Sequence, residues 1–346
     1  MNNFFGNNSY ILLVFTHIIL ISIACLIIFF KNKISTYLKI IDYPDNNLKI
    51  HQIPTPRFGG LILFFYTLPT LLLNYQINSG SLKELIISLI LYVVFFAVGL
   101  VDDQKLLSAR YKSFVLLTAL LLSIPLSNEL IVSKINFKNL DFYINLQQAA
   151  IFFTIFSIFA LYNAFNFSDG INCVATSLGI FWTIFIIIKS GSYSNIHYQA
   201  ILISLIIVFY SNYKKKIFLG NSGSSLFSVI ISLILIQEYK KKNIFCDEIF
   251  IILFLPGIDM IRLCIQRIIS KKSPFFGDNN HLHHLMRPII KDKFIFLAYI
   301  LISIAPILIY NFLIKNFYLT FALSITIYFA VYYYLTYQKK FLLEKK

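Results

Sequence analysis

The sequence carries little charge and has especially few acidic residues. Only 13% of the 346 residues are charged, and Asp and Glu together account for 15 of them. Soluble domains carry about twice that share of charge, so an ordinary water-soluble or disordered protein is excluded. The hydrophobic share is 58% and the mean hydropathy is +0.75, which places the chain in the membrane class.

Cysteine is also scarce. The four cysteines show no Cys-x-x-Cys spacing, so neither a zinc ribbon nor a disulfide framework is indicated. They lie in or beside apolar stretches, where we expect small buried hydrophobic side chains. No segment is long enough for a separate soluble domain and no repeat is present. We therefore expect a single polytopic domain over residues 1–346, with its motifs between about 40 and 300.

Apolar stretches long enough to cross a bilayer as helices, about 20 residues each, follow one another along the chain. They predict an all-α integral membrane protein with about eleven transmembrane helices. Residues Met1–Asn8 contain no Lys or Arg, unlike the start of a cleaved signal peptide, so we expect the first helix to be retained. The predicted spans are 10–30, 59–76, 84–101, 113–128, 147–163, 173–189, 198–213, 222–238, 247–265, 292–313 and 318–336.

The basic residues divide unevenly between the two sides of these spans. Loops on the side of the C-terminus contain 22 of the 30 Lys and Arg residues. The positive-inside rule then predicts an outside N-terminus and a cytoplasmic C-terminus. The net charge of +15 is thus explained mainly by topology. A nucleic-acid partner is not expected, because the basic residues of such binders cluster on one solvated face.

Nearly every unusual polar cluster falls in the loops predicted to be cytoplasmic, which indicates a functional cleft on that face. The first of these loops contains Lys49 and the segment Pro54–Gly60, with Arg57 at its centre. Its two prolines stiffen the chain, and its two glycines let the backbone approach a ligand or a helix closely. A rigid turn before the second span is the alternative.

Two adjacent carboxylates, Asp102 and Asp103, follow the third span. At a membrane–water boundary such a pair repels and is costly to desolvate unless a cation is present. A divalent metal would resolve both problems. The alternative is a pair of solvated acids that begins a loop.

Three oxygen-bearing side chains follow the fifth span at intervals of three residues: Asn163, Asn166 and Asp169. On a helix this spacing places them in one row. Amide and carboxylate oxygens suit Mg²⁺ or a polar ligand. The alternative is a helix C-terminus that ends in an Asp-Gly turn.

A glycine- and serine-rich segment, Gly220–Ser225, follows three lysines, Lys214–Lys216, after the seventh span. Such a segment can open a helix and present backbone N–H groups to a phosphate. It is not a Walker A loop, because the Gly-Lys-Ser/Thr ending is absent. The lysines alone fit the role of topological anchors.

The last large loop is the richest in polar side chains, with Asp259, Arg262 and the segment His281–His284. Zinc is one interpretation, but no cysteine or His-Glu-x-x-His partner accompanies the histidines. Histidines and arginines beside a carboxylate-held cation fit a diphosphate site better, and a solvated loop is the alternative. Pro256 and Gly257 predict a kink or break in the ninth span.

Five motifs in order carry a resemblance to a known family: PTPRFGG, GLVDD, NAFNFSDG, GNSGS and PGIDMIR…SPFFGDNNHLHH. Together they resemble the polyprenyl-phosphate N-acetylhexosamine-1-phosphate transferases, glycosyltransferase family 4. The histidine motif is similar to that of the undecaprenyl-phosphate N-acetylglucosamine-1-phosphate transferases. The phospho-N-acetylmuramoyl-pentapeptide transferases, which usually have three consecutive histidines there, are the alternative branch.

The resemblance implies an enzyme of the bacterial cytoplasmic (inner) membrane, folded as about ten or eleven helices with a cytoplasmic cleft. It would transfer a sugar-1-phosphate, with N-acetylglucosamine as the default sugar, from a UDP-sugar to undecaprenyl phosphate and release UMP. The product would initiate a cell-surface polysaccharide such as O-antigen, capsule or teichoic acid. Members of the family depend on Mg²⁺, with Mn²⁺ as an alternative, and some are homodimers.

Carried over by position, the resemblance implies a set of site residues. The candidate catalytic residues are Asp102, Asp103, Asp169 and His281; the substrate-binding residues are Lys49, Arg57, Asn163, Asn166, Arg262, His283 and His284; the metal ligands are Asp102, Asp103, Asp169 and Asn221.

This chain departs from the family at Asn221, where the family usually has an aspartate that binds the metal, and at Cys173 and Asn279. The asparagine keeps a carbonyl ligand but gives up a charge, so a catalytically weak member with an assembly role is one competing interpretation. A transporter of an anionic solute is another, but it predicts pseudo-repeats and polar residues on both sides of the membrane midplane. The chain has no repeat, and its polar clusters lie on one side.

Overall fold

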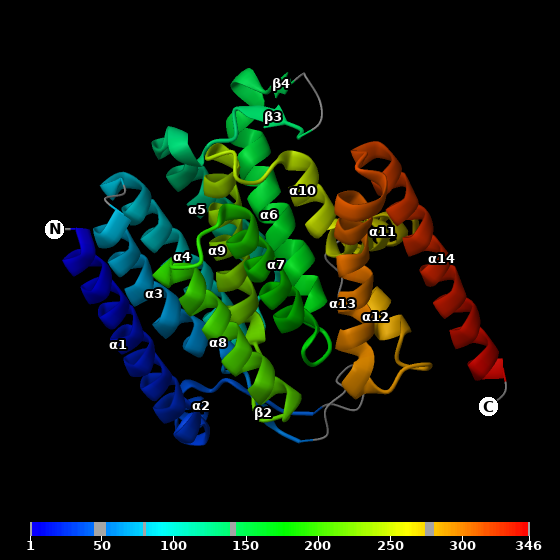
Figure 1. The fold of residues 1–346 in the computed structure, drawn as a ribbon. Helices are drawn as coiled ribbons and strands as arrows, with labels where there is room; N and C mark the ends of the chain where they lie inside the picture. Colours follow the sequence, from blue (N-terminus) through cyan, green and yellow to red (C-terminus); the bar gives the residue numbers. More distant parts are fainter. Residues whose placement is uncertain (1, 45–52, 79–80, 139–142, 274–279, 345–346) are drawn as a thin grey trace.

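The structure is a computed structural model that describes residues 2–44, 53–78, 81–138, 143–273 and 280–344 (Figure 1). It is an all-α architecture with two small pairs of strands. The elements in chain order are α1 (Asn2–Phe29), α2 (Lys31–Leu38), β1 (Ile41–Asp42), β2 (Thr55–Pro56), α3 (Gly59–Asn78), α4 (Leu82–Gln104), α5 (Ala109–Ser123), η1 (Ile124–Leu126), η2 (Asn128–Leu130), β3 (Lys134–Asn136), β4 (Tyr143–Asn145), η3 (Gln147–Ala149), α6 (Ala150–Ser168), α7 (Val174–Ser190), α8 (Ile196–Tyr213), α9 (Gly220–Lys240), α10 (Cys246–Ile252), α11 (Phe254–Ile269), α12 (Leu282–Leu285), α13 (Asp292–Leu308), η4 (Ile309–Ile314) and α14 (Phe317–Glu344).

Within these ranges, eight helical segments are long and apolar enough to cross a membrane: α3, α4, α5 with η1, η3 with α6, α8, α9, α13 with η4, and α14. They contain eight of the eleven predicted spans. The span predicted over 10–30 lies in α1, which meets α2 at a bend of 70° and makes a ninth candidate. The span predicted over 173–189 is the shorter apolar helix α7, of 17 residues. Eleven crossings and the sides of the two termini stay predictions.

The span predicted over 247–265 is divided into two helices. α10 ends at Ile252 and α11 begins at Phe254, so the break lies just before the predicted position. Pro256 is the third residue of α11. The first N–H groups of a helix have no acceptor within the helix, so a proline there costs no hydrogen bond. α11 buries charged residues, among them Asp259 and Arg262, and exposes Ile261. A helix on the surface of a soluble protein instead buries its apolar side chains and exposes its charged ones. Charged side chains turned inward and apolar side chains turned outward are expected where a helix faces lipid.

α9 is the central helix of the bundle (Figure 1). In its span 89% of the residues are buried, against 22% in α5 and α14. Two glycines allow other helices to approach its first turn. A Cβ on Gly99 of α4 would lie 2.6 Å from the Cα of Ser222, and a Cβ on Gly60 of α3 would lie 2.5 Å from the backbone nitrogen of Gly223. The beginning of α9 is therefore enclosed by backbone on two sides.

Short strands join the first loop to the beginning of α9. β1 and β2 pair antiparallel, and Arg57 forms a parallel bridge with Phe218. The N–H of Phe218 donates to the carbonyl of Pro56 at 2.8 Å, and the N–H of Gly59 donates to the carbonyl of Phe218 at 2.8 Å. These bonds satisfy backbone groups at the entry to two helices and bring distant parts of the sequence together.

The opposite end of the bundle, where β3 and β4 pair, also has a cluster of polar side chains, although the sequence predicts nearly all such clusters for the other end. It contains three buried acidic residues, and each of them is paired. Glu238 accepts a hydrogen bond from the Tyr198 hydroxyl at 2.7 Å, and Glu248 lies 2.6 Å from the Lys189 ammonium. Asp247 accepts a short hydrogen bond from Tyr310. These contacts connect helix ends, and each of the three carboxylates has a hydrogen-bond or ion-pair partner.

The crossing at Gly99 can be tested by Gly99→Ala. The added Cβ would force the backbones of α4 and α9 apart, so we expect a loss of about 1–3 kcal/mol of stability and a lower midpoint of thermal unfolding in detergent. Gly257→Ala in α11 is the control, because no atom lies within 4 Å of the added Cβ and the midpoint should stay or rise slightly. Equal midpoints for the two variants would contradict the close crossing.

Candidate active site

A cavity of about 600 Å³ lies at the end of the bundle where α4 and α6 end and α9 begins. All five motifs contribute to its lining, through Arg57, Asp103, Asp169, Asn221 and His284. The structure thus brings together residues that are separated by up to 227 positions in the sequence. Lys49 lies outside the described residues. Six other candidates stand behind the lining: Asp102, Asn163, Asn166, Arg262, His281 and His283.

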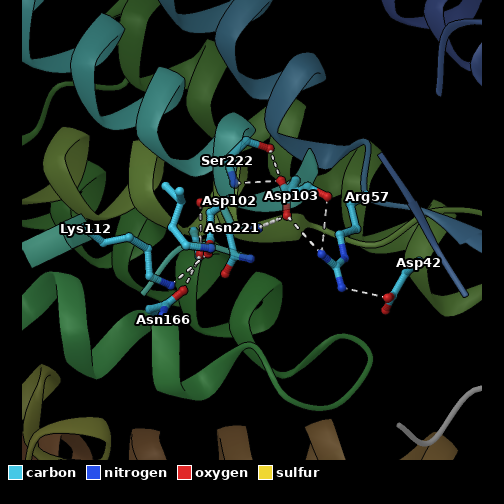
Figure 2. A network of polar contacts seen from close by, with 10 residues as sticks. Asp42, Arg57, Asp102, Asp103, Lys112, Asn166, Asn221 and Ser222 are labelled. Carbon is cyan, nitrogen blue, oxygen red and sulfur yellow. Dashed lines mark hydrogen bonds and ion pairs between the residues drawn. The ribbon is translucent and has the colours of Figure 1, made fainter. Parts of the chain in front are cut away.

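Asp103 holds the beginning of α9 (Figure 2). Its Oδ1 accepts the N–H of Asn221 at 2.9 Å, and its Oδ2 accepts the N–H and the hydroxyl of Ser222 at 2.9 and 2.8 Å. A carboxylate in this place satisfies N–H groups that the first turn of a helix leaves unpaired. Two of the backbone donors that the glycine-serine segment offered to a phosphate are therefore used by Asp103, which corrects that expectation.

Arg57 lies between two carboxylates at the edge of the cavity (Figure 2). Its Nη2 is 2.6 Å from Asp42 Oδ1, and its Nη1 is 3.9 Å from Asp103 Oδ1. The guanidinium is thereby fixed in direction while it remains part of the lining. Sequence reasoning missed Asp42. The available signal was the scarcity of acids, because Asp42 is one of only 15 and stands in the same loop as Arg57.

Asp102 turns away from Asp103 and toward α5. Its Oδ2 is 2.8 Å from the Lys112 ammonium, and its Oδ1 accepts the N–H of Leu107 at 2.8 Å. The side chain is 2% exposed, so the charge is buried but paired. The two neighbouring carboxylates therefore do not form a pair that faces one cation. Lys112 was missed, although its position ten residues after Asp102 at the start of a span was a signal.

The row predicted on α6 is divided in the structure. The Asn163 amide donates to the carbonyl of Phe159 in its own helix at 2.8 Å. Asn166 Oδ1 accepts the Ser224 hydroxyl of α9 at 2.9 Å, which explains a polar residue inside an apolar span. Asp169 lines the cavity because the helix ends at Ser168 and the chain leaves the row there. Of the three, Asp169 alone is placed to touch a molecule in the cavity.

Asp169 has the least satisfied carboxylate of the cavity. The described part of the chain provides no hydrogen-bond donor for it. Burial raises the pKa of Asp169 well above its ordinary value, and the charge of Asp103 raises it further, whereas Arg57 lowers it. A group of this kind gains from a bound cation, because a cation stabilises the ionised form.

The histidine motif is held by α11. The ring of His281 lies with Nδ1 3.1 Å from Asp259 Oδ2, and the N–H of Leu282 points to the same carboxylate at 3.3 Å. Arg262 Nη2 is 2.7 Å from Asp259 Oδ1 and donates to the carbonyl of Asn280 at 2.8 Å. Arg262 is therefore occupied with fixing this segment. It does not face the cavity.

His283 and His284 connect this segment to the cavity. A Cβ on Gly170 would lie 2.8 Å from His283 Nε2 and 2.6 Å from His284 Nε2, so only glycine fits beside these rings. His283 is fully buried, and neither of its ring nitrogens has a hydrogen-bond partner among the described residues. Burial lowers the pKa of His283 well below its ordinary value, and the neighbouring His284 and His281 lower it further, against the opposing effect of Asp259. Its ring is therefore neutral near pH 7.

A magnesium ion fits the cavity only with help from a ligand. No three Asp, Glu, His or Cys side chains within the described ranges converge closely enough to hold a metal by themselves. Asp169 and Asn221 line one cavity, and the Asp169 carboxylate has no donor within the described ranges. Mg²⁺ is commonly bound by one or two carboxylates together with waters and substrate phosphates. Asp169 and Asn221 are the residues that would hold it here.

Sequence comparison finds a family match over part of the chain. The family model described as glycosyl transferase family 4 matches residues 85–238, which include Asp103, Asp169 and Asn221. The chain is 26% identical to a probable undecaprenyl-phosphate N-acetylglucosaminyl 1-phosphate transferase of Bacillus subtilis (strain 168), over 73% of this chain and 71% of the relative.

Two further relatives come from other bacteria. A decaprenyl-phosphate N-acetylglucosaminephosphotransferase of Mycobacterium leprae (strain TN) is 25% identical over 71% of this chain and 70% of its own length. An undecaprenyl-phosphate alpha-N-acetylglucosaminyl 1-phosphate transferase of Escherichia coli (strain K12) is 26% identical over 75% and 72%. The motifs, their convergence on one cavity and these similarities all point to glycosyl transferase family 4.

Proposed function

We propose that the protein transfers N-acetylhexosamine-1-phosphate, by default N-acetylglucosamine-1-phosphate, from a UDP-sugar to undecaprenyl phosphate. UMP is the second product, and the lipid-linked sugar initiates a cell-surface polysaccharide such as lipopolysaccharide O-antigen. The observation that carries the proposal is the convergence of all five motifs on one cavity. The names of the relatives, which act on polyprenyl phosphates, support the acceptor.

The proposed setting is the bacterial cytoplasmic membrane, with the cavity open to the cytoplasm. All five motifs lie in or next to loops that the positive-inside rule assigns to the cytoplasmic side. A UDP-sugar would reach the cavity from that side, and the acceptor phosphate would reach it from the membrane. A homodimer stays a prediction from the family resemblance.

The reaction we propose is a direct displacement. An oxygen of the lipid phosphate forms a bond to the β-phosphorus of the UDP-sugar, and the bond from this phosphorus to the bridging oxygen breaks as UMP leaves. A phosphate monoester has a second pKa near 6, so the nucleophile is largely ionised at pH 7. Catalysis then consists mainly of holding two anions in contact and stabilising charge, for which Arg57 and His284 line the cavity.

Mg²⁺ is part of the proposal, with Mn²⁺ as an alternative, and when bound it would neutralise charge on the diphosphate. Asp169 and Asn221 are the residues proposed to hold it. Asp103 fixes the backbone of Asn221 through the hydrogen bond to its N–H, so it orients this ligand from behind. Asp102 is proposed to assist from outside the cavity by orienting Lys112.

The first test is release of UMP by the purified protein with UDP-N-acetylglucosamine, undecaprenyl phosphate and Mg²⁺. We expect turnover that requires both substrates. A panel of UDP-N-acetylhexosamines, including 6-deoxy sugars and UDP-N-acetylmuramoyl-pentapeptide, would identify the sugar and separate the two branches of the family. Absence of turnover with every donor would reject the enzyme and favour the assembly role that Asn221 suggests.

The role of Asp102 can be tested with Asp102→Asn, Lys112→Met and the double variant. If Asp102 acts by orienting Lys112, each single change should lower kcat by about 10- to 100-fold, and the double variant should be no slower than the worse single variant. UMP release measures all three. A full rate for Asp102→Asn would refute the assignment, and effects that multiply would mean that the two residues act separately.

The metal site can be tested by adding the missing charge. Removal of metal with EDTA should abolish turnover, and Mg²⁺ should restore it. Asn221→Asp should lower the half-saturating Mg²⁺ concentration by about tenfold, because a carboxylate replaces a neutral ligand. Asn172→Asp is the matched control, since it adds the same charge to the same cavity at another place. An equal shift in both variants would mean a general electrostatic effect and no ligation by residue 221.

A further inference from the structure

The last long helix, α14, contacts the histidine motif although it lies outside the segment that the family model matches. Its Tyr328 is 1% exposed and points to α11. The Tyr328 hydroxyl donates to Asp259 Oδ1 at 2.7 Å and accepts a hydrogen bond from Arg262 Nε at 2.7 Å. A buried hydroxyl with one donor and one acceptor bond, both to charged groups, is fully used and fixed in direction.

The same carboxylate determines which ring nitrogen of His281 carries the hydrogen. Asp259 Oδ1 receives Tyr328 and Arg262, and Oδ2 faces His281 Nδ1 at 3.1 Å. An ionised carboxylate only accepts hydrogen bonds, so Nδ1 of His281 carries the hydrogen. In the neutral ring Nε2 then keeps its lone pair, and the ring plane follows from the position of the carboxylate.

Contacts between histidine rings connect the fixed ring of His281 to the cavity. His281 and His283 stack with centroids 5.5 Å apart, and the centroids of His283 and His284 are 4.5 Å apart. His284 lines the cavity, and Gly170 lies against it with no room for a side chain. A small rotation of His281 would therefore displace its neighbours, because close-packed rings have no free space around them.

The geometry assigns Tyr328 a role as a positioning residue: through Asp259 it fixes the ring of His281 and with it the histidine segment beside the cavity. This inference rests on the proposed function, since the histidine segment that it positions lines the cavity of the proposed transfer through His284. Tyr328 itself touches no substrate. It acts through the carboxylate, so its loss should change the rate of the chemical step more than substrate binding.

A second tyrosine one turn away on α14 provides a matched control. The Tyr332 hydroxyl accepts a hydrogen bond from Gln266 at 2.9 Å, and its ring lies 4.5 Å from the Arg262 guanidinium. Among the described residues, the side chains that hydrogen-bond to Asp259 are those of Arg262, His281 and Tyr328, so Tyr332 makes no such bond. Tyr328→Phe and Tyr332→Phe each remove one hydroxyl from the same helix, and only the first removes a bond to Asp259.

Kinetics of UMP release from UDP-N-acetylglucosamine is the first measurement. Tyr328→Phe should lower kcat by about 10- to 100-fold and leave KM for the UDP-sugar within about twofold, because a misplaced group costs rate more than binding. Tyr332→Phe should keep kcat within about twofold. A full kcat for Tyr328→Phe, or an equal loss in both variants, would overturn the inference.

The second measurement does not depend on activity. The chain has only six histidines, so ¹⁵N-histidine labelling gives a simple spectrum in detergent, in which His281→Gln identifies the His281 signals. Tyr328→Phe should shift these signals and Tyr332→Phe should not. Asp259→Asn, a second variant that removes the acceptor charge, should shift them as well. If Asp259→Asn shifts them and Tyr328→Phe does not, Tyr328 only packs and the inference fails.

The two measurements separate this inference from the proposed function. Absence of turnover in the unchanged protein with every UDP-sugar would reject the proposed function. The histidine spectra would then decide alone whether Tyr328 fixes His281. Turnover by the unchanged protein together with unshifted His281 signals in Tyr328→Phe would reject the positioning role and leave the transferase in place.

Discussion

The hydrogen bonds of the Asp103 carboxylate to the first turn of α9 are the interaction on which the cavity depends. A helix that begins inside a protein leaves N–H groups that must find acceptors. Asp103 accepts from Asn221 and Ser222, and its charge complements the positive end of the helix dipole. Gly99, one turn earlier on α4, permits the close approach that these bonds require. One helix end thus fixes the position of the other.

The rest of the site is built outward from this contact. Arg57 reaches it from the first loop and is held on its far side by Asp42. α6 adds Asp169, and Gly170 brings the histidine segment against the same cavity. The cavity consequently contains cationic and anionic groups on opposing elements. This arrangement suits two anionic substrates that must be held in contact.

Five of the candidates predicted from the sequence line one cavity, and the predicted contacts differ from the structure where helix geometry decides the direction of a side chain. Asp102 and Asp103 were treated as a pair, but successive side chains on a helix diverge by about 100°, so one faces α5 and the other α9. The Asn163–Asp169 row failed because its helix ends at Ser168. Partners such as Lys112 depend on packing between distant segments, which local patterns do not encode.

The glycine contacts have a consequence for how this sequence can change over time. Every substitution of glycine adds atoms, so drift at Gly60, Gly99 or Gly170 can proceed in only one direction, toward collision with a neighbour. At Gly60 and Gly99 a compensating change would have to remove backbone atoms of α9, which no substitution can do, and at Gly170 it would have to replace a histidine of the motif. Gly60 and Gly99 therefore restrict which sequences can form the cavity more strictly than positions whose neighbours are side chains.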